Sequence, residues 1–131
     1  MTGEKYKILI VDDDKFLLDI YTVKFREFGF DIDTAMSGQE ALDKLKAGAK
    51  KFNVLLLDMV MPIMGGLELL AEVKKQKLDD GLVIIVLTNQ GQPEDIKKAQ
   101  EYDVDGYIVK ATSIPSEVLA EVKQIVDKKL G

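Results

Sequence analysis

The chain has 131 residues, of which 47% are hydrophobic, and this length and composition suit one domain, residues 1–131, with one apolar core. It contains no histidine and no cysteine, which excludes imidazole and thiolate chemistry, including Ser-His-Asp and zinc sites, and leaves carboxylates and carbonyls as metal ligands. A formal net charge of -5, with basic residues scattered among acids, argues against direct nucleic-acid binding.

The apolar stretches of the chain are short. The longest, Leu82 to Leu87, cannot cross a bilayer, and the first residues lack the apolar segment of a secretory signal. We therefore expect a cytoplasmic protein with no membrane contact.

Five apolar runs recur along the chain, and each is followed by a segment with helical spacing. This alternation predicts an α/β fold in which a doubly wound parallel sheet of five strands is covered by five helices. The first, third and fourth runs are continuously apolar, as expected for central strands buried on both faces. The runs are Lys7 to Val11, Phe30 to Thr34, Val54 to Leu57, Leu82 to Leu87 and Gly106 to Val109.

The first two helices are predicted from their end signals. The first begins near Asp14 and ends at Gly29, and the second starts at Ser37, which has capping-box spacing with Glu40. The spacing of apolar residues predicts inward faces made of Leu17, Tyr21, Phe25 and Phe28 in the first helix and of Ala41, Leu42 and Leu45 in the second.

The remaining helices differ in their apolar content. The third follows Gly65 and Gly66, the fourth opens at Pro93, and the fifth has Pro115 in its first turn. The fourth has the fewest apolar residues, so we expect it to pack weakly and to be a moving part. The expected inward residues are Leu67, Leu70 and Ala71 in the third helix, Ile96, Ala99 and Tyr102 in the fourth, and Val118, Leu119, Val122, Ile125 and Val126 in the fifth.

Polar residues follow the carboxyl ends of four of the predicted strands. Asp12 and Asp13 follow the first strand, Asp58 the third, Thr88 ends the fourth and Lys110 the fifth. Ligands bind open α/β sheets at this edge, where the strand order reverses. If the order is 2-1-3-4-5, the first and third strands are neighbours, and Asp13 and Asp58 should lie about one strand spacing apart, ~5 Å.

The chemistry expected at this edge is phosphoryl transfer. Carboxylates so close together stay ionised only with cationic compensation, for which a divalent cation is the natural partner. Lys110 lies two strands from Asp58, roughly 10 Å at the backbone, a distance that its side chain partly covers. A carboxylate nucleophile, a cation, an ammonium and the Thr88 hydroxyl are the groups needed to move a phosphoryl group onto Asp58.

Each residue alone also has a simpler interpretation. Asp14 suits a helix cap, and Asp58 suits a turn more often than a nucleophile. Thr88 is ordinary at a strand end, Lys110 would normally be solvated, and Tyr107 suits a half-buried strand aromatic. The joint occurrence of polar groups at the ends of four strands, all on one edge, favours the functional interpretation.

Four segments together resemble the receiver domain of bacterial two-component response regulators. The form they resemble is the stand-alone receiver domain of chemotaxis regulators. The resemblance covers nearly the whole chain and implies a flavodoxin-like sheet in the order 2-1-3-4-5. The segments are KILIVDDD at 7–14, LLLDMVMPIMGG at 55–66, VIIVLTN at 83–89 and DGYIVK at 105–110.

The resemblance also implies the roles of the site residues. Asp58 would accept a phosphoryl group from a histidine kinase, a phosphotransfer protein or a small phosphodonor. Asp12 and Asp13, together with Asp58 and the backbone carbonyl of Val60, would hold Mg²⁺, and Lys110 would pair first with Asp58 and then with the phosphate. The chain would thus be a regulatory phosphoacceptor that catalyses its own phosphoryl transfer.

Signal output is implied at a face of the domain away from this site. Thr88 would reorient toward the phosphate and let Tyr107 turn inward. The face made by the fourth helix, fifth strand and fifth helix would then rearrange to control an output protein or a second copy of the chain. The weak packing expected of the fourth helix agrees with such an element.

Three positions depart from the usual pattern of the family. Ala111 stands where a proline commonly follows the lysine, Gly65 replaces a frequent aspartate, and Asn89 replaces a small residue. As a hypothesis, Val60 and Asn89 crowd the attacking water and slow hydrolysis of the phosphorylated form.

Two alternatives remain open at this point. A module that keeps the fold but signals without phosphorylation should have lost at least one of Asp13, Asp58, Thr88 and Lys110. A phosphohydrolase with an aspartate nucleophile should carry an acid-base Asp two residues after the nucleophile, where this chain has Val60.

Overall fold

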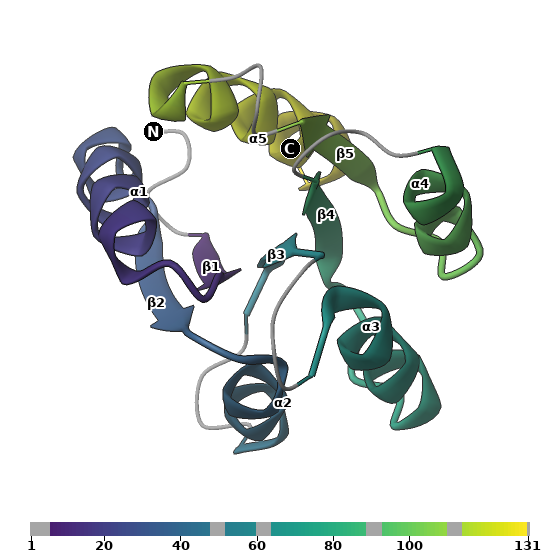
Figure 1. The fold of residues 1–131 in the computed structure, drawn as a ribbon. Coiled ribbons are helices and arrows are strands. Elements are labelled where there is room, and N and C mark those ends of the chain that lie inside the picture. Colours follow the sequence, from purple (N-terminus) through teal and green to yellow (C-terminus); the bar gives the residue numbers. More distant parts are fainter. Residues whose placement is uncertain (1–5, 48–51, 60–63, 89–92, 110–113, 131) are drawn as a thin grey trace.

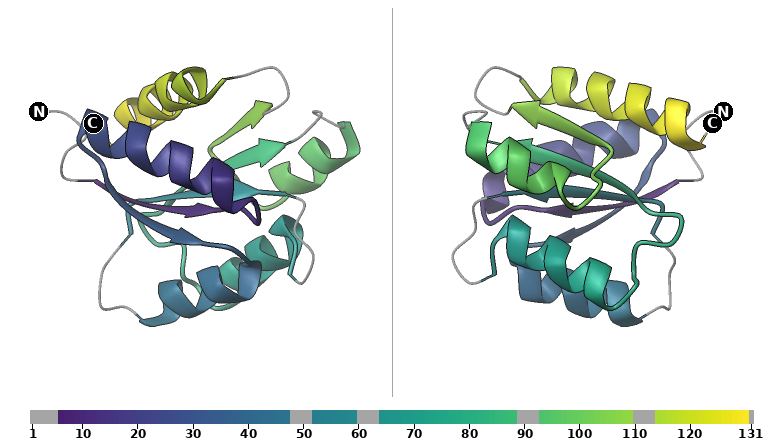
Figure 2. Two further views of the ribbon diagram at one scale, coloured as in Figure 1. Left: turned by 60° about the vertical axis from the view of Figure 1, so that its left-hand side comes forward. Right: turned by 90° about the vertical axis from the view of Figure 1, so that its right-hand side faces the viewer.

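The computed structural model describes residues 6–47, 52–59, 64–88, 93–109 and 114–130. A twisted parallel sheet forms the middle layer, with α1 and α5 on one face and α2, α3 and α4 on the other (Figures 1 and 2). Within the described ranges, no helix combines the length and apolar character that crossing a membrane requires.

The five strands pair in the order β2-β1-β3-β4-β5, all parallel, as predicted. Strands β1, β3 and β4 are buried along their whole length, which explains their continuous apolar sequences. The strands are β1 (Lys7–Val11), β2 (Asp31–Ala35), β3 (Val54–Asp58), β4 (Val83–Thr88) and β5 (Gly106–Val109).

One helix follows each strand, and the sheet separates two apolar cores. Side chains from α1 and α5 pack on one face around Tyr21 and Phe25, and side chains from α2, α3 and α4 pack on the other around Leu69 and Leu70. Because both faces are covered, the polar ends of the strands are the place where the chain can offer a site. The helices are α1 (Lys15–Phe28), α2 (Gly38–Ala47), α3 (Gly66–Lys75), α4 (Pro93–Gln100) and α5 (Pro115–Leu130).

The ends of α1 and α2 follow the predicted signals, with one difference. Asp14 caps α1, since its carboxylate accepts from the Leu17 amide at 3.2 Å, and Gly29 ends the helix with a φ of 120°. Ser37 caps α2 through its hydroxyl, which accepts from the Glu40 amide at 3.1 Å. The Glu40 carboxylate accepts from the amide of Met36, one residue before the position that a capping box requires.

The structure differs from two of the predictions: one strand begins a residue later than predicted, and one helix turns a different side toward the core. Strand β2 begins at Asp31, because Phe30 belongs to the turn that ends α1, where its amide donates to the carbonyl of Phe25 at 3.1 Å. In α3 the buried side consists of Leu69, Leu70 and Val73, while Leu67 and Ala71 are only half-buried. Contacts with α2 and the sheet, which the spacing alone does not specify, decide which side faces inward.

The fourth helix contributes little to the core in its described part. Ala99 is fully buried, and Tyr102, in the turn that follows α4, is half-buried against the same core. The side chain of Ile96, the third expected anchor, lies outside the described residues. The small buried surface agrees with the weak packing predicted for this helix.

Strand β2 forms one edge of the sheet and is the most charged strand. Asp31 pairs with Lys7 at 3.4 Å, and Asp33 pairs with Lys44 of α2 at 2.8 Å. The Lys44 ammonium also donates to the carbonyl of Thr34 at 2.6 Å. The two Lys44 contacts hold α2 against the edge of the sheet, whereas the Lys7 contact joins β1 to β2.

Candidate functional site

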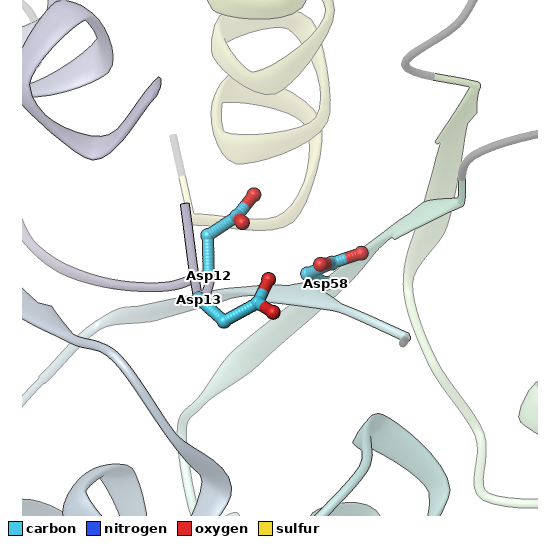
Figure 3. Close-up of side chains that lie close together, drawn as sticks. All are labelled: Asp12, Asp13 and Asp58. Carbon is cyan, nitrogen blue, oxygen red and sulfur yellow. The ribbon is translucent and has the colours of Figure 1, made fainter. Parts of the chain in front are cut away.

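Three carboxylates meet at the carboxyl ends of β1 and β3. One oxygen from each of Asp12, Asp13 and Asp58 lies within 4.8 Å of the others. Figure 3 shows Asp12 and Asp13, which follow β1, together with Asp58 at the end of β3. The structure therefore confirms that these three predicted residues come together.

The register of the sheet places these residues. Val11 of β1 is the partner of Leu57 of β3, so the residues that follow them, Asp12 and Asp58, lie at the same level at the carboxyl ends of the strands. The amide of Asp12 donates to the carbonyl of Ala35 in β2 at 3.1 Å, which fixes the chain as it leaves β1. Asp58 is itself paired with Leu87 of β4, so β3 is held by β1 on one side and by β4 on the other.

The three carboxylates differ in their exposure. Asp12 is fully buried and Asp58 is 4% exposed, whereas Asp13 is exposed. One oxygen of Asp12 accepts from the amide of Asp14 at 3.0 Å, which orients its carboxylate toward the start of α1. The site thus has two buried acids and one that meets the solvent.

The buried phenol of Tyr21 lies close enough to this site to be affected by its charges. Burial raises the pKa of Tyr21 to about 12, and the negative charges of Asp12 and Asp58 act in the same direction. The sequence predicted Tyr21 only as an inward residue of the first helix. Its position near the acids follows from how α1 packs on the sheet and on α5, which helical spacing does not define.

The donor set fits a hard divalent cation. Carboxylate oxygens are the ligands that Mg²⁺ prefers, and opposite ligands on one Mg²⁺ ion lie ~4.2 Å apart. The 4.8 Å limit on the oxygen separations is close to this value, so small side-chain rotations bring the three within reach of one ion. Asp12, Asp13 and Asp58 can therefore hold Mg²⁺ together.

Two further predicted site residues are placed only in part. Thr88 ends β4, is 4% exposed, and is paired with Val109 at the end of β5. Thr88 therefore lies at the same edge of the sheet as Asp58. Lys110, which directly follows Val109, and Val60, whose carbonyl was predicted to bind the metal, lie outside the described residues, as do Asn89 and Ala111.

Tyr107 lies on β5, half-buried against α4. Its ring packs on the core shared by α2, α3 and α4, and its hydroxyl is hydrogen-bonded by the side chain of Gln100, the last residue of α4. Burial raises the pKa of Tyr107, and the hydrogen bond from Gln100 opposes this rise. Tyr107 therefore links β5 to α4, a contact that the sequence alone did not predict.

Comparisons with known proteins match this fold and this site. The family model for the response regulator receiver domain matches residues 8–123. The alkaline phosphatase synthesis transcriptional regulatory protein PhoP of Bacillus subtilis is 34% identical over 120 residues, which cover 92% of this chain and 48% of that protein. The response regulator SaeR of Staphylococcus aureus is 31% identical over 121 residues, with 92% and 50% covered. The chain thus spans about half the length of these curated relatives.

Solved structures agree with the sequence comparisons. The CheY-like receiver domain protein of Methanospirillum hungatei superimposes with a TM-score of 0.83 at 30% identity, covering 95% of each chain. The chemotaxis protein CheY4 of Vibrio cholerae has a TM-score of 0.82 at 28% identity, covering 92% of this chain and 98% of that one. With the 2-1-3-4-5 sheet and the acidic pocket of Asp12, Asp13 and Asp58, these matches show that the chain belongs to the response regulator receiver domain family.

Proposed function

We propose that the chain is a phosphorylation-dependent switch of a two-component phosphorelay, in which Asp58 accepts the phosphoryl group. The observation that carries this proposal is the convergence of Asp58 with Asp12 and Asp13 within 4.8 Å. Receiver domains pair with histidine kinases, so the donor is a histidine kinase or a phosphotransfer protein. Residues 1–131 serve as one receiver domain in a cytoplasmic protein.

The transfer step forms a new bond at Asp58. An oxygen of the Asp58 carboxylate forms a P–O bond while the P–N bond to the donor imidazole breaks, and the bonding electron pair leaves with the imidazole nitrogen. Asp58 is 4% exposed, so the incoming group exchanges water for the fixed polar groups of the site. The product is an acyl phosphate on Asp58.

The Asp58 carboxylate and the phosphoryl group are both negatively charged, so they approach each other only when their charge is compensated. Mg²⁺, when bound, neutralises the negative charge that develops on the phosphoryl oxygens. Asp12, Asp13 and Asp58 would hold the ion, together with the carbonyl of Val60 in this proposal. In this proposal the ammonium of Lys110, which follows Val109 in the sequence, pairs with Asp58 before transfer and with the phosphoryl group afterwards.

The output step involves Thr88 and Tyr107. Thr88 turns its hydroxyl toward the phosphoryl group, and Tyr107 turns inward into the space that Thr88 leaves. The contact between Tyr107 and Gln100 couples this change to α4, whose described side chains, residues 97–100, bury little surface apart from Ala99. The face of α4, β5 and α5 then presents a different surface to an output protein or to a second copy of the chain.

Intact-mass measurement tests this function. The protein is incubated with Mg²⁺ and acetyl phosphate, and we expect the parent chain to gain the mass of one phosphoryl group. Asp58→Asn should gain none, and removal of Mg²⁺ with a chelator should abolish the gain in the parent. Asp14→Asn is the matched control, because Asp14 caps α1 outside the carboxylate group and Asn caps equally well.

Three outcomes would contradict the proposal. No gain of mass in the parent would favour a module that signals without phosphorylation. An equal gain in Asp58→Asn would place the phosphoryl group on another residue. Continuous turnover of a general phosphatase substrate would favour the phosphohydrolase alternative.

A further inference from the structure

Two glycines leave no room for a Cβ atom against the β3–α3 segment, by which we mean the described residues Asp58, Met59, Met64 and Gly65. A Cβ on Gly66, the first residue of α3, would lie 2.8 Å from the Cα of Met59 and 2.9 Å from the carbonyl oxygen of Asp58. A Cβ on Gly38, the first residue of α2, would lie 2.5 Å from the carbonyl oxygen of Met64. Ordinary contacts between non-bonded heavy atoms are ~3.5 Å or longer, so either Cβ would displace the backbone.

The peptide that follows Asp58 is held from both sides. The amide of Met59 donates to the carbonyl of Leu87 in β4 at 3.1 Å. The carbonyl of Met59 accepts from the amide of Gly66 at 3.0 Å. The backbone that bears Asp58 is thus fixed between β4 and the first turn of α3.

The contact of Gly38 supports the same segment from α2. Met64 lies two residues before Gly66, and its Cβ and Cγ would also lie within 2.8 Å of a Cβ on Gly38. Gly38 belongs to a different helix and lies outside the carboxylate group. The contact with Met64 therefore gives a change at Gly38 a route to Asp58 through the β3–α3 segment.

We propose that Gly66 and Gly38 are positioning residues, which let the starts of α3 and α2 press the β3–α3 segment into the place that brings Asp58 close to Asp13. This inference rests on the proposed function, because it concerns how well the three carboxylates share one cation. Ligand sites are sensitive to shifts of a few tenths of an ångström, so a displaced segment weakens the site even when the fold is retained.

Two substitutions and one matched control test the inference. Gly66→Ala and Gly38→Ala each introduce a Cβ against the backbone of the segment. Gly81→Ala is the control: Gly81 has a φ of 72°, which strains any other residue, but nothing lies within 4 Å of its Cβ position. Gly81 precedes the first residue of β4, so it lies at the amino ends of the strands, whereas the carboxylates lie at the carboxyl ends. The control therefore destabilises the fold without touching the site.

Two measurements distinguish positioning from general stability. Titration calorimetry gives the Mg²⁺ dissociation constant, which we expect to rise about tenfold in Gly66→Ala, less in Gly38→Ala, and not in Gly81→Ala. Amide hydrogen exchange of Met59, compared with Leu9 in β1, should be faster in the first two variants only. If Gly66→Ala does not fold, Gly38→Ala carries the test.

The outcomes separate this inference from the proposed function. If the parent accepts a phosphoryl group but both variants match Gly81→Ala in Mg²⁺ affinity and Met59 exchange, the inference fails and the function stands. If the parent neither binds Mg²⁺ nor is phosphorylated, the function fails, and Met59 exchange alone decides the inference. Unchanged exchange in both variants then overturns it, and faster exchange supports it.

Discussion

Val11 and Leu57 are partners across β1 and β3, and this pairing brings Asp12 and Asp58, which follow them, to the same edge of the sheet. The two acids come from distant parts of the chain, so the site exists only when the parallel sheet has formed. The negative charges that lie close together in this site have measurable consequences for the stability of the folded protein.

Substitution of Asp13 should stabilise the protein in the absence of metal. Asp13→Asn removes one of three carboxylates that lie within 4.8 Å of each other, and relief of one like-charge interaction near the surface is worth about 1 kcal/mol. At low ionic strength with a chelator, we expect the melting temperature to rise by about 3 °C, measured by circular dichroism. Added Mg²⁺ should stabilise the parent but hardly affect the variant. A lower melting temperature for Asp13→Asn without metal, while Asp14→Asn is unchanged, would contradict this account.

Tyr21 should make the protein sensitive to alkaline pH. Its pKa is raised to about 12 by burial and then by Asp12 and Asp58, so ionisation is favoured in the unfolded chain. The stabilisation is complete below the ordinary tyrosine pKa of about 10 and is lost as pH rises toward 12, up to roughly 3 kcal/mol. Tyr21→Phe should flatten the fall in unfolding free energy over this range, measured by urea denaturation. A fall as steep as in the parent would show that other groups cause it.

Gln100 should bias the conformation of Tyr107. Its side chain hydrogen-bonds the Tyr107 hydroxyl, and a bond of this kind contributes about 0.5 to 1.5 kcal/mol. Gln100→Ala should therefore raise the fraction of inward Tyr107 by a factor of roughly 2 to 10 before phosphorylation. NMR of the labelled tyrosine ring measures this fraction, with Glu101→Ala as the control on the next, exposed residue. Identical ring spectra in Gln100→Ala and the parent would refute the coupling.

The contact between Lys74 and Asp79 should contribute to stability only above the acid range. The hydrogen bond from Lys74 at 2.8 Å holds the pKa of Asp79 below its usual value. Its contribution is present above about pH 4 and is lost as pH falls through the lowered pKa. Because the pair is partly solvated, Lys74→Gln should cost less than about 1 kcal/mol at neutral pH and nothing in strong acid. Urea denaturation at both pH values checks this, and Lys75→Gln, at an exposed position, is the control.

The lifetime of the phosphorylated form should depend on Val60 and Asn89. If their side chains crowd the attacking water, Val60→Asn and Asn89→Ala should each speed autodephosphorylation. The decay of the phosphorylated mass, measured after the donor is removed, gives the rate. Rates equal to that of the parent in both variants would remove the hypothesis.

The sheet and its site were largely predictable because they depend on patterns that the sequence displays directly. Continuous apolar runs such as those of β3 and β4 define buried parallel strands, and the polar residue that follows each run, such as Asp58, lies at one edge by topology. The caps Asp14 and Ser37 depend on local hydrogen bonds, so their residue types were sufficient.

Other features depend on how whole elements pack, and no local pattern encodes them. The inward side of α3 is set by its contact with α2, and the position of Tyr21 near the acids is set by the packing of α1 on the sheet and on α5. Gly38 and Gly66 are visible in the sequence, but their contacts with Met64 and Asp58 join residues that are brought together only by the fold.

The charged edge of the sheet at β2 bears on how copies of the protein can meet. An edge strand presents unpaired backbone groups to which a strand of another molecule can add. Asp31 and Asp33, with their partners Lys7 and Lys44, line this edge with charged groups, and the ammonium of Lys44 already donates to the carbonyl of Thr34. Growth of the sheet from one molecule into the next is therefore disfavoured here, which protects the protein against aggregation at high concentration.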